Sequence, residues 1–123
     1  MDDDEVQRSK MFRAEDVLQY IPNAIQSKTI IKKTTGSVTA LSFDAGEVLN
    51  AKVLPFDTLL QIIDGEAEVI IAGSAYALRM GESIVIPAHT HNSIRAMVRF
   101  KMLSTIIKGG YEEVTWSGER VSN

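Results

Sequence analysis

Short apolar stretches, each broken after a few residues by glycine, proline or aspartate, run along most of the chain. Several of them alternate hydrophobic with polar positions, which is typical of β-strands with one buried face. Turns recur about every 8–12 residues, a spacing typical of β-sandwiches and barrels. The expected strands span residues 29–33, 37–43, 48–54, 58–63, 66–72, 75–78 and 83–86, with one or two more between 93 and 107. The pattern therefore predicts an all-β fold.

Two local signals add detail to this pattern. Asp64 and Gly65 directly follow the apolar stretch 58–63, and this dipeptide predicts a two-residue hairpin turn in which the glycine has a positive φ. Residues 11–20 predict one short helix that Pro22 would stop. A helix of this length is not stable alone, so we expect it to pack on the strands.

The chain has 123 residues, which fits one domain. Its first residues are acidic and carry no apolar anchor, so we expect residues 1–10 to be disordered. Residues 11–110 are expected to form the single domain. Residues 111–123 have little pattern, and we expect a loosely ordered tail there.

Composition narrows the function classes. Thirteen basic residues against 16 acidic ones give a net charge of −3, which argues against nucleic-acid binding. The absence of cysteine excludes disulfides, thiolate metal sites and a cysteine nucleophile. No basic leader with an apolar stretch opens the sequence, and no apolar run approaches the roughly 20 residues that span a bilayer. We therefore expect a soluble cytoplasmic protein with no membrane partner.

Some of the expected strands carry apolar residues on both faces. The adjacent pairs are Leu59-Leu60, Ile62-Ile63 and Ile70-Ile71. A strand of this kind needs cover on its outer face as well as its inner one. The short helix or a second subunit would supply that cover, and we predict a homodimer.

Glycine and proline spacing connects the chain to a known family. Gly46 and Gly65 stand where the first motif of the cupins begins and ends, and Gly81 and Pro87 match the second motif at the required spacing. The chain resembles a small single-domain cupin over about residues 36–107. This resemblance implies a double-stranded β-helix, that is, a jelly-roll barrel.

The same motifs in the family carry three histidines and a glutamate that bind a metal. Counting along this sequence puts Lys52, Leu54, Thr58 and Asn92 at those four positions. Lysine is a cation at neutral pH, leucine offers no lone pair, and threonine and asparagine are weak neutral donors. The resemblance thus implies a metal-free cupin without a cofactor, which acts as a small-molecule binding module or a structural module.

Two histidines leave an alternative open. His89 and His91 lie two residues apart near the second motif, so an extended segment would put them on one side. With Asp57 or Gln61 they would form a rearranged metal site, as in a dioxygenase or isomerase on this fold. A third hypothesis is a metal-free enzyme that uses His91 and Asp57 as acid and base. The candidate ligand-binding residues are Lys52, Thr58, His89, His91 and Asn92.

The remaining candidates are cations. Lys52 would either pair with an anionic ligand, act as an activated amine, or pack its stem on the barrel wall with its head in solvent. Arg95, Arg99 and Lys101 share one face of a late strand by period-two alternation. We expect these three to form a solvated outer face.

Overall fold

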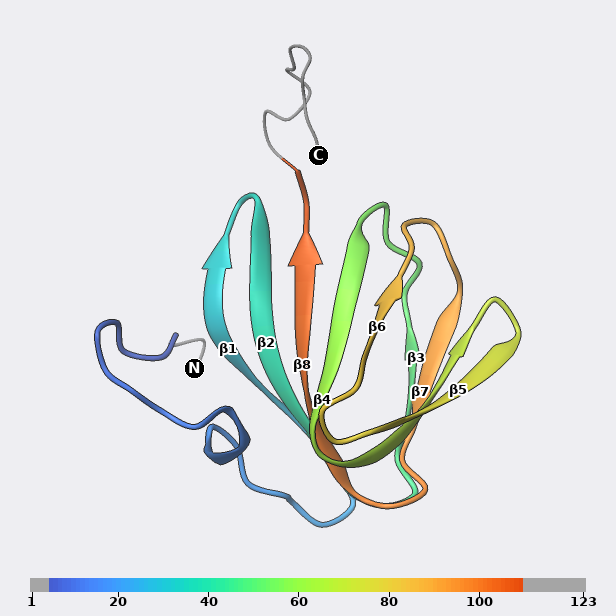
Figure 1. Ribbon diagram of the computed structural model, residues 1–123, viewed down its shortest axis with the longest axis horizontal. Coiled ribbons are helices and arrows are strands. Elements are labelled where there is room, and N and C mark those ends of the chain that lie inside the picture. The colour runs from blue at the N-terminus through green and yellow to red at the C-terminus, as the bar shows by residue number, and fades with distance from the viewer. Residues whose placement is uncertain (1–4, 110–123) are drawn as a thin grey trace.

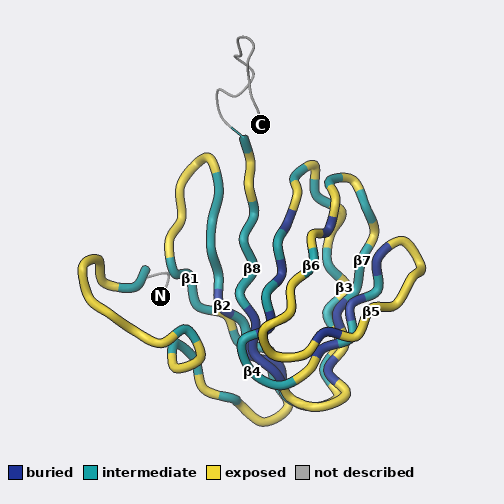
Figure 2. The backbone as a smooth tube through the Cα atoms, in the orientation of Figure 1, coloured by how far each residue is buried: buried dark blue, intermediate teal, exposed yellow. Residues whose placement is uncertain are grey.

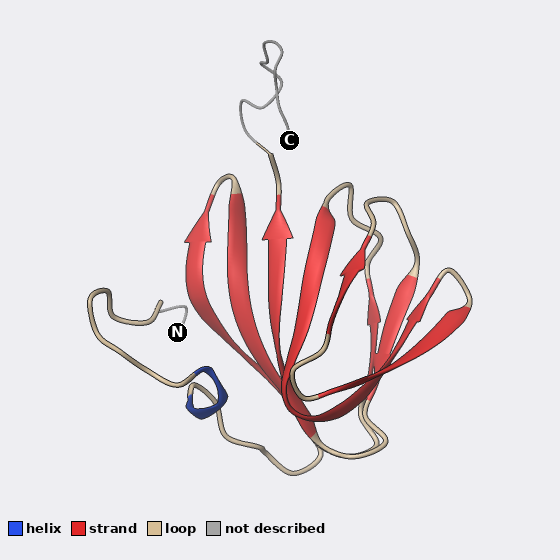
Figure 3. Cartoon of the chain, in the orientation of Figure 1, coloured by secondary structure: helices blue, strands red, loops and turns tan. Residues whose placement is uncertain are grey.

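The computed structural model describes residues 5–109. This part of the chain holds eight strands and one turn of 3-10 helix (Figures 1 and 3). The elements in chain order are η1 (Ala14–Asp16), β1 (Ile25–Lys33), β2 (Gly36–Phe43), β3 (Val48–Ala51), β4 (Asp57–Ile71), β5 (Ser74–Arg79), β6 (Ser83–Ile86), β7 (Asn92–Arg95) and β8 (Phe100–Ile107). The predicted all-β fold is confirmed, and the strands form a curled antiparallel sheet.

The sheet has two layers that share one strand. The first layer runs β1-β2-β8-β4-β6, and the second layer runs β3-β7-β4-β5, with every neighbouring pair antiparallel. The first half of β4 pairs with β8 and β6, and its second half pairs with β5 and β7. The 15 residues of β4 therefore run through both layers and connect them.

The hairpin predicted at Asp64-Gly65 is wrong. The strand β4 continues through this dipeptide, and its pairing with β8 shifts register between Ile62 and Asp64. Gly65 does have a positive φ, +76°, but it bends the strand from one layer into the other. A Cβ atom at Gly65 would overlap the carbonyl oxygen of Arg99 and lie 2.9 Å from the Cα atom of Phe100. The glycine is needed for a bulge and a close approach rather than for chain reversal.

The helix predicted over residues 11–20 is wrong as well, because only Ala14–Asp16 forms a single 3-10 turn. Tertiary contacts compete with helical hydrogen bonds in this segment. The Nζ atom of Lys101 donates to the carbonyl oxygen of Glu15 at 2.6 Å, and the Tyr20 hydroxyl donates to Asp64 at 2.6 Å. The segment is thus fastened to β4 and β8 by polar contacts.

Lys101 also differs from its predicted solvated position. It is only 8% exposed, and its ammonium group lies 4.8 Å from the centre of the Tyr20 ring. The three cations do not share one strand either, because Arg95 ends β7, Arg99 lies in the loop before β8, and Lys101 is on β8. Arg95 and Arg99 are exposed, as expected. Strand alternation alone did not reveal that the N-terminal segment covers Lys101.

Of the N-terminal segment that is predicted to be disordered, residues 1–10, the structure describes residues 5–10. Residues 1–4 and the predicted loose tail 111–123 lie outside the described residues. Within the described part, the backbone amide of Val6 donates to Ile30 at 3.3 Å, and that of Lys32 donates to Glu5 at 2.7 Å. Residues 5 and 6 therefore lie beside β1. None of the helices in residues 5–109 is long and apolar enough to cross a membrane.

The core lies where the strands converge. Figure 2 shows the buried segments gathered around β4, β7 and β8, whereas the opposite end of the molecule is mostly half-buried or exposed. Phe43 and Phe100 are fully buried, and their rings stack with centres 4.5 Å apart. The core residues are Phe43, Leu60, Ile62, Ala67, Val69, Ile71, Leu78, Ile86, Ile94, Ala96, Phe100 and Met102. The less buried end is where the candidate site lies.

Candidate functional site

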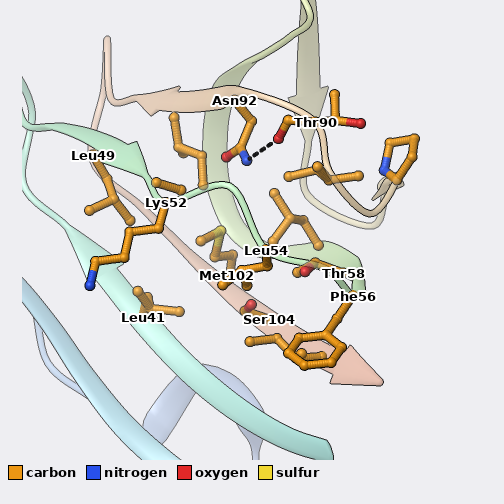
Figure 4. A pocket seen from close by; sticks show the side chains of 16 residues that line it. Leu41, Leu49, Lys52, Leu54, Phe56, Thr58, Thr90, Asn92, Met102 and Ser104 are labelled. Carbon is orange, nitrogen blue, oxygen red and sulfur yellow. Dashed lines mark hydrogen bonds between the residues drawn. The ribbon is translucent and has the colours of Figure 1, made fainter. Parts of the chain in front are cut away.

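A cavity of about 160 Å³ lies between the two layers, at the end of the molecule where β4 begins and β8 ends (Figure 4). Eleven of its 16 lining residues are apolar, and the polar ones are Lys52, Thr58, Thr90, Asn92 and Ser104. The apolar lining residues are Leu41, Leu49, Ala51, Leu54, Phe56, Leu60, Ile86, Pro87, Ile94, Met102 and Ile106. The site is thus an apolar chamber with a few polar groups, as small-molecule sites usually are.

Strand alternation places the polar side chains. On β8, Met102, Ser104 and Ile106 occupy alternate positions and all line the cavity. Ser104 pairs with Leu60 of β4, a strand that also contributes Thr58 to the lining. From the second layer, Asn92 opens β7 and pairs with Ala51 of β3. Each layer therefore contributes both polar and apolar groups to the chamber.

The two histidines do not line this cavity. Thr90, which stands between them, does, so the segment presents residues 90 and 92 inward. His89 is exposed and has a φ of +62°, and its backbone amide donates to the carbonyl oxygen of Leu54 at 2.6 Å. His91 is exposed and borders a surface depression with Asn50 and Ser93, which shares Ala51 and Asn92 with the cavity. Within residues 5–109, no three histidine, aspartate or glutamate side chains group as a metal site.

Asp57 has a local structural contact. Its carboxylate accepts a hydrogen bond from the backbone amide of Ala88 at 2.8 Å. Like His91, it is not part of the cavity lining. The acid and base hypothesis required both side chains in one cavity, and the structure does not bring them together there. Asp57 instead ties the start of β4 to the loop between β6 and β7.

Comparison with solved structures decides the fold family. A conserved protein of unknown function from Streptococcus pyogenes superimposes with a TM-score of 0.81 at 23% identity, over 87% of this chain and 94% of that one. A cupin superfamily protein from Desulfitobacterium hafniense gives a TM-score of 0.76 at 24% identity, over 85% and 95% of the two chains. A cupin 2 conserved barrel domain protein from Leptotrichia buccalis gives 0.76 at 32% identity, over 79% of this chain. The chain folds as a small cupin domain.

This cupin domain spans 47% of the Leptotrichia buccalis chain, so it matches about half of that protein. No family model matches the sequence. No curated protein matches it either. The comparisons therefore give the fold, and the chemistry has to be argued from the residues of this cupin domain.

The four positions that correspond to the metal ligands of cupins all line the cavity. They are Lys52, Leu54, Thr58 and Asn92. The motif spacing predicted that these residues lie together, although they come from three parts of the chain. Lys52 is exposed, and Figure 4 shows its amine nitrogen extending away from Asn92. A cation, an alkyl group, a hydroxyl and an amide do not suit a divalent metal, which takes imidazole, carboxylate or thiolate ligands. The residues present do not fit the metal that the fold family implies.

Asn92 is the most informative polar group in this cupin domain. Its amide nitrogen donates a long hydrogen bond, 3.5 Å, to the carbonyl oxygen of Thr90. Its Oδ1 atom is buried and has no hydrogen-bond partner among the described residues. A buried carbonyl oxygen without a partner costs about 1–3 kcal/mol, so this atom needs an explanation.

Sequence reasoning found Lys52, Thr58 and Asn92 but missed Thr90 and Ser104. Ser104 had a usable signal, because it alternates with two apolar residues that face the core. Thr90 had none, because it precedes β7 and its direction depends on the register of the loop.

Proposed function

We propose that this cupin domain binds a small, mostly apolar molecule without the help of a metal ion. The observation that supports the proposal is the cavity of about 160 Å³ at the family's ligand positions. A cavity of about 150 Å³ with apolar walls is large enough to hold benzene in another protein. The chamber is therefore of a size to enclose one small ring.

The metal-free part of the proposal rests on donor chemistry. Lys52 and Leu54 stand where two histidines would bind the ion, and an ammonium group repels a divalent cation. Metal analysis of the purified protein tests this point directly. A stoichiometric transition metal that survives purification and is retained on dialysis would contradict it.

Binding is tested by titrating isotopically labelled protein with benzene and recording amide NMR spectra. We expect shifts at cavity residues on three strands, such as Leu41, Thr58 and Ile94, with a dissociation constant of about 1 mM or lower. Ala51→Leu should weaken binding because it fills the cavity. The control is Ala77→Leu, since Ala77 is exposed on β5 and does not line this cavity. Equal shifts in both variants would contradict binding in the chamber.

The metal-dependent enzyme at His89 and His91 gains no support from the placement of these side chains outside the lining. The homodimer remains a prediction. Among the described residues, Val85 is 54% and Val98 51% exposed, and a second copy would cover such apolar side chains. Light scattering at micromolar concentration tests the dimer, and a monomer mass would contradict it. The cytoplasmic location also remains a prediction, which cell fractionation would test.

A further inference from the structure

We infer that two copies of this cupin domain associate through the outer face of the first layer, with Ile107 of each copy seated over Gly36 of the other. The inference goes beyond the proposed function, because it concerns a surface outside the cavity. The outer face is the face of β1, β2, β8, β4 and β6 that points away from the cavity. Three observations support it: an apolar row of residues that is open at both ends, a depression beside a protruding side chain, and two opposite charges at matching places on the face.

Strand alternation assigns the residues of the outer face. Leu60 of β4 and Ser104 of β8 line the cavity, so their neighbours Leu59 and Thr105 point outward. Residues that pair directly across an antiparallel ladder share a face. The pairing of the five strands therefore aligns one row of side chains on the outer face (Figure 1). In the order β1-β2-β8-β4-β6, the row consists of Ile31, Val38, Thr105, Leu59 and Val85.

The N-terminal segment covers the outer face near the start of β8. There the Nζ atom of Lys101 donates to the carbonyl oxygen of Glu15. The row lies farther along β8 and is open at its two ends, since Ile31 is 36% and Val85 54% exposed. An apolar sheet face of this kind needs a protein cover.

A depression lies in the outer face where β2 begins. It has a volume of about 230 Å³, and Ile31, Gly36 and Ile107 are among the residues that line it. Gly36 pairs with Ile107 of β8. The glycine has no side chain to fill the depression, whereas Ile107 is 63% exposed. A hollow and a protruding apolar side chain are therefore neighbours on adjacent strands.

One two-fold axis brings the hollow and the side chain together. It runs parallel to the strands, midway between β2 and β8, so it exchanges β2 with β8 and β1 with β4 when two outer faces are stacked. Ile107 of each copy then lies over Gly36 of the other and enters the depression. In the neighbouring row, the same axis places Ile31 over Leu59. Both copies use the same surface, so the contact closes as a dimer.

Charge favours the same axis. The row that contains Gly36 and Ile107 has a charged residue on each side of this pair. These residues are Lys33 on β1 and Asp57 on β4, and both are exposed. The axis places Lys33 of each copy over Asp57 of the other. An axis that ran across the strands at this row would set Lys33 against Lys33, which is repulsive. Shape and charge therefore select one arrangement.

The first test measures the mass of the full chain by light scattering over a range of protein concentrations. We expect the parent to form a dimer. Ile107→Glu should raise the dissociation constant of the dimer about tenfold or more, because it would bury a carboxylate in an apolar contact. Met97→Glu is the matched control, since Met97 is 70% exposed but borders a depression of the second layer. The control should dissociate like the parent.

The second test exchanges the two charges. Lys33→Asp and Asp57→Lys should each weaken the dimer, and the double variant should be tighter than either single variant because it restores opposite charges. Asp57→Lys also removes the acceptor of the Ala88 amide, so circular dichroism has to show that this variant folds. If it does not fold, the comparison of Ile107→Glu with Met97→Glu decides the inference.

Three results overturn the inference. The first is a monomeric parent, whether the face stays open or residues 110–123 of the same chain cover it. The second is a dimer that Met97→Glu weakens as much as Ile107→Glu does, because association then uses another surface. The third is a folded double charge variant that is no tighter than the single variants, because the axis is then wrong. The proposed function stands in all three cases, since the benzene titration tests the cavity separately.

Discussion

Replacing Gly65 with alanine separates two costs that the structure assigns to this position. The first cost is conformational, because a non-glycine residue with a positive φ loses about 1–2 kcal/mol. The second is steric, because the new Cβ atom would overlap Arg99 O and lie 2.9 Å from Phe100 Cα. Both are backbone atoms at the start of β8, Arg99 directly before the strand and Phe100 its first residue, and they do not rotate away. Overpacking of this kind costs about 1–3 kcal/mol in addition.

Two other glycines serve as controls, because each of them carries only one of the two costs. Gly73 has a φ of +87° with no atom within 4 Å of an added Cβ, so Gly73→Ala reports conformation alone. A Cβ atom on Gly36 would lie 2.5 Å from Ile106 O without a positive φ, so Gly36→Ala reports the steric cost alone. We expect Gly65→Ala to lower the free energy of unfolding by about 2–5 kcal/mol, more than either control.

The assay is urea denaturation followed by far-ultraviolet circular dichroism, with the three variants and the parent at the same pH. Two-state transitions with equal slopes are required for the comparison. If Gly65→Ala is no less stable than Gly73→Ala, the close approach of β4 to β8 at this point is wrong. The explanation of the bend in β4 would then fail with it.

Three further predictions concern the fold. Phe100→Ala should lower the free energy of unfolding by about 3–5 kcal/mol in urea titrations, because it removes a fully buried ring stacked on Phe43; a loss below about 1 kcal/mol would contradict this packing. Ala72 has a φ of +50° in the turn between β4 and β5, so Ala72→Asn should raise the urea midpoint, and an unchanged or lower midpoint would count against the turn geometry. The hydrogen bond from the Asn23 backbone amide holds the pKa of Asp44 below its usual value of 3.8, so the folded state binds this proton less readily than the unfolded state. The stabilisation is therefore present above about pH 4 and lost as the pH falls further, and Asp44→Asn should flatten the acid side of the stability curve measured by urea midpoints; identical curves would refute this linkage.

The sequence predicted the cavity positions better than the path of the chain. Lys52, Thr58 and Asn92 were found because a fixed count from Gly46, Gly65 and Pro87, respectively, puts a residue at a fixed place in a barrel whose strands keep register. The predicted path of the chain is wrong at Asp64-Gly65, because a glycine with a positive φ occurs in a bulge as well as in a turn. Only the pairing with β8 distinguishes the bulge from the turn.

The direction of the histidines was beyond sequence reasoning for a similar reason. Period-two alternation gives two choices for His89 and His91, and a shift of one residue exchanges them. The backbone hydrogen bond from His89 to Leu54 is a contact between two loops, so no local sequence pattern indicates the orientation of the two histidines. The same holds for Lys101, whose burial depends on the distant Glu15.

Because β4 runs through both layers, cleavage of this strand has a consequence for the folding of the resulting fragments. A cut within β4 divides both layers between the two fragments, because β6 and β8 pair with its first half but follow it in the chain, and β3 precedes it but pairs with β7. Fragments separated at that strand should therefore not fold independently. Thr58 and Leu60 lie on this strand and line the chamber. A change that loosens the first half of β4 therefore alters the chamber as well as the pairing of the two layers.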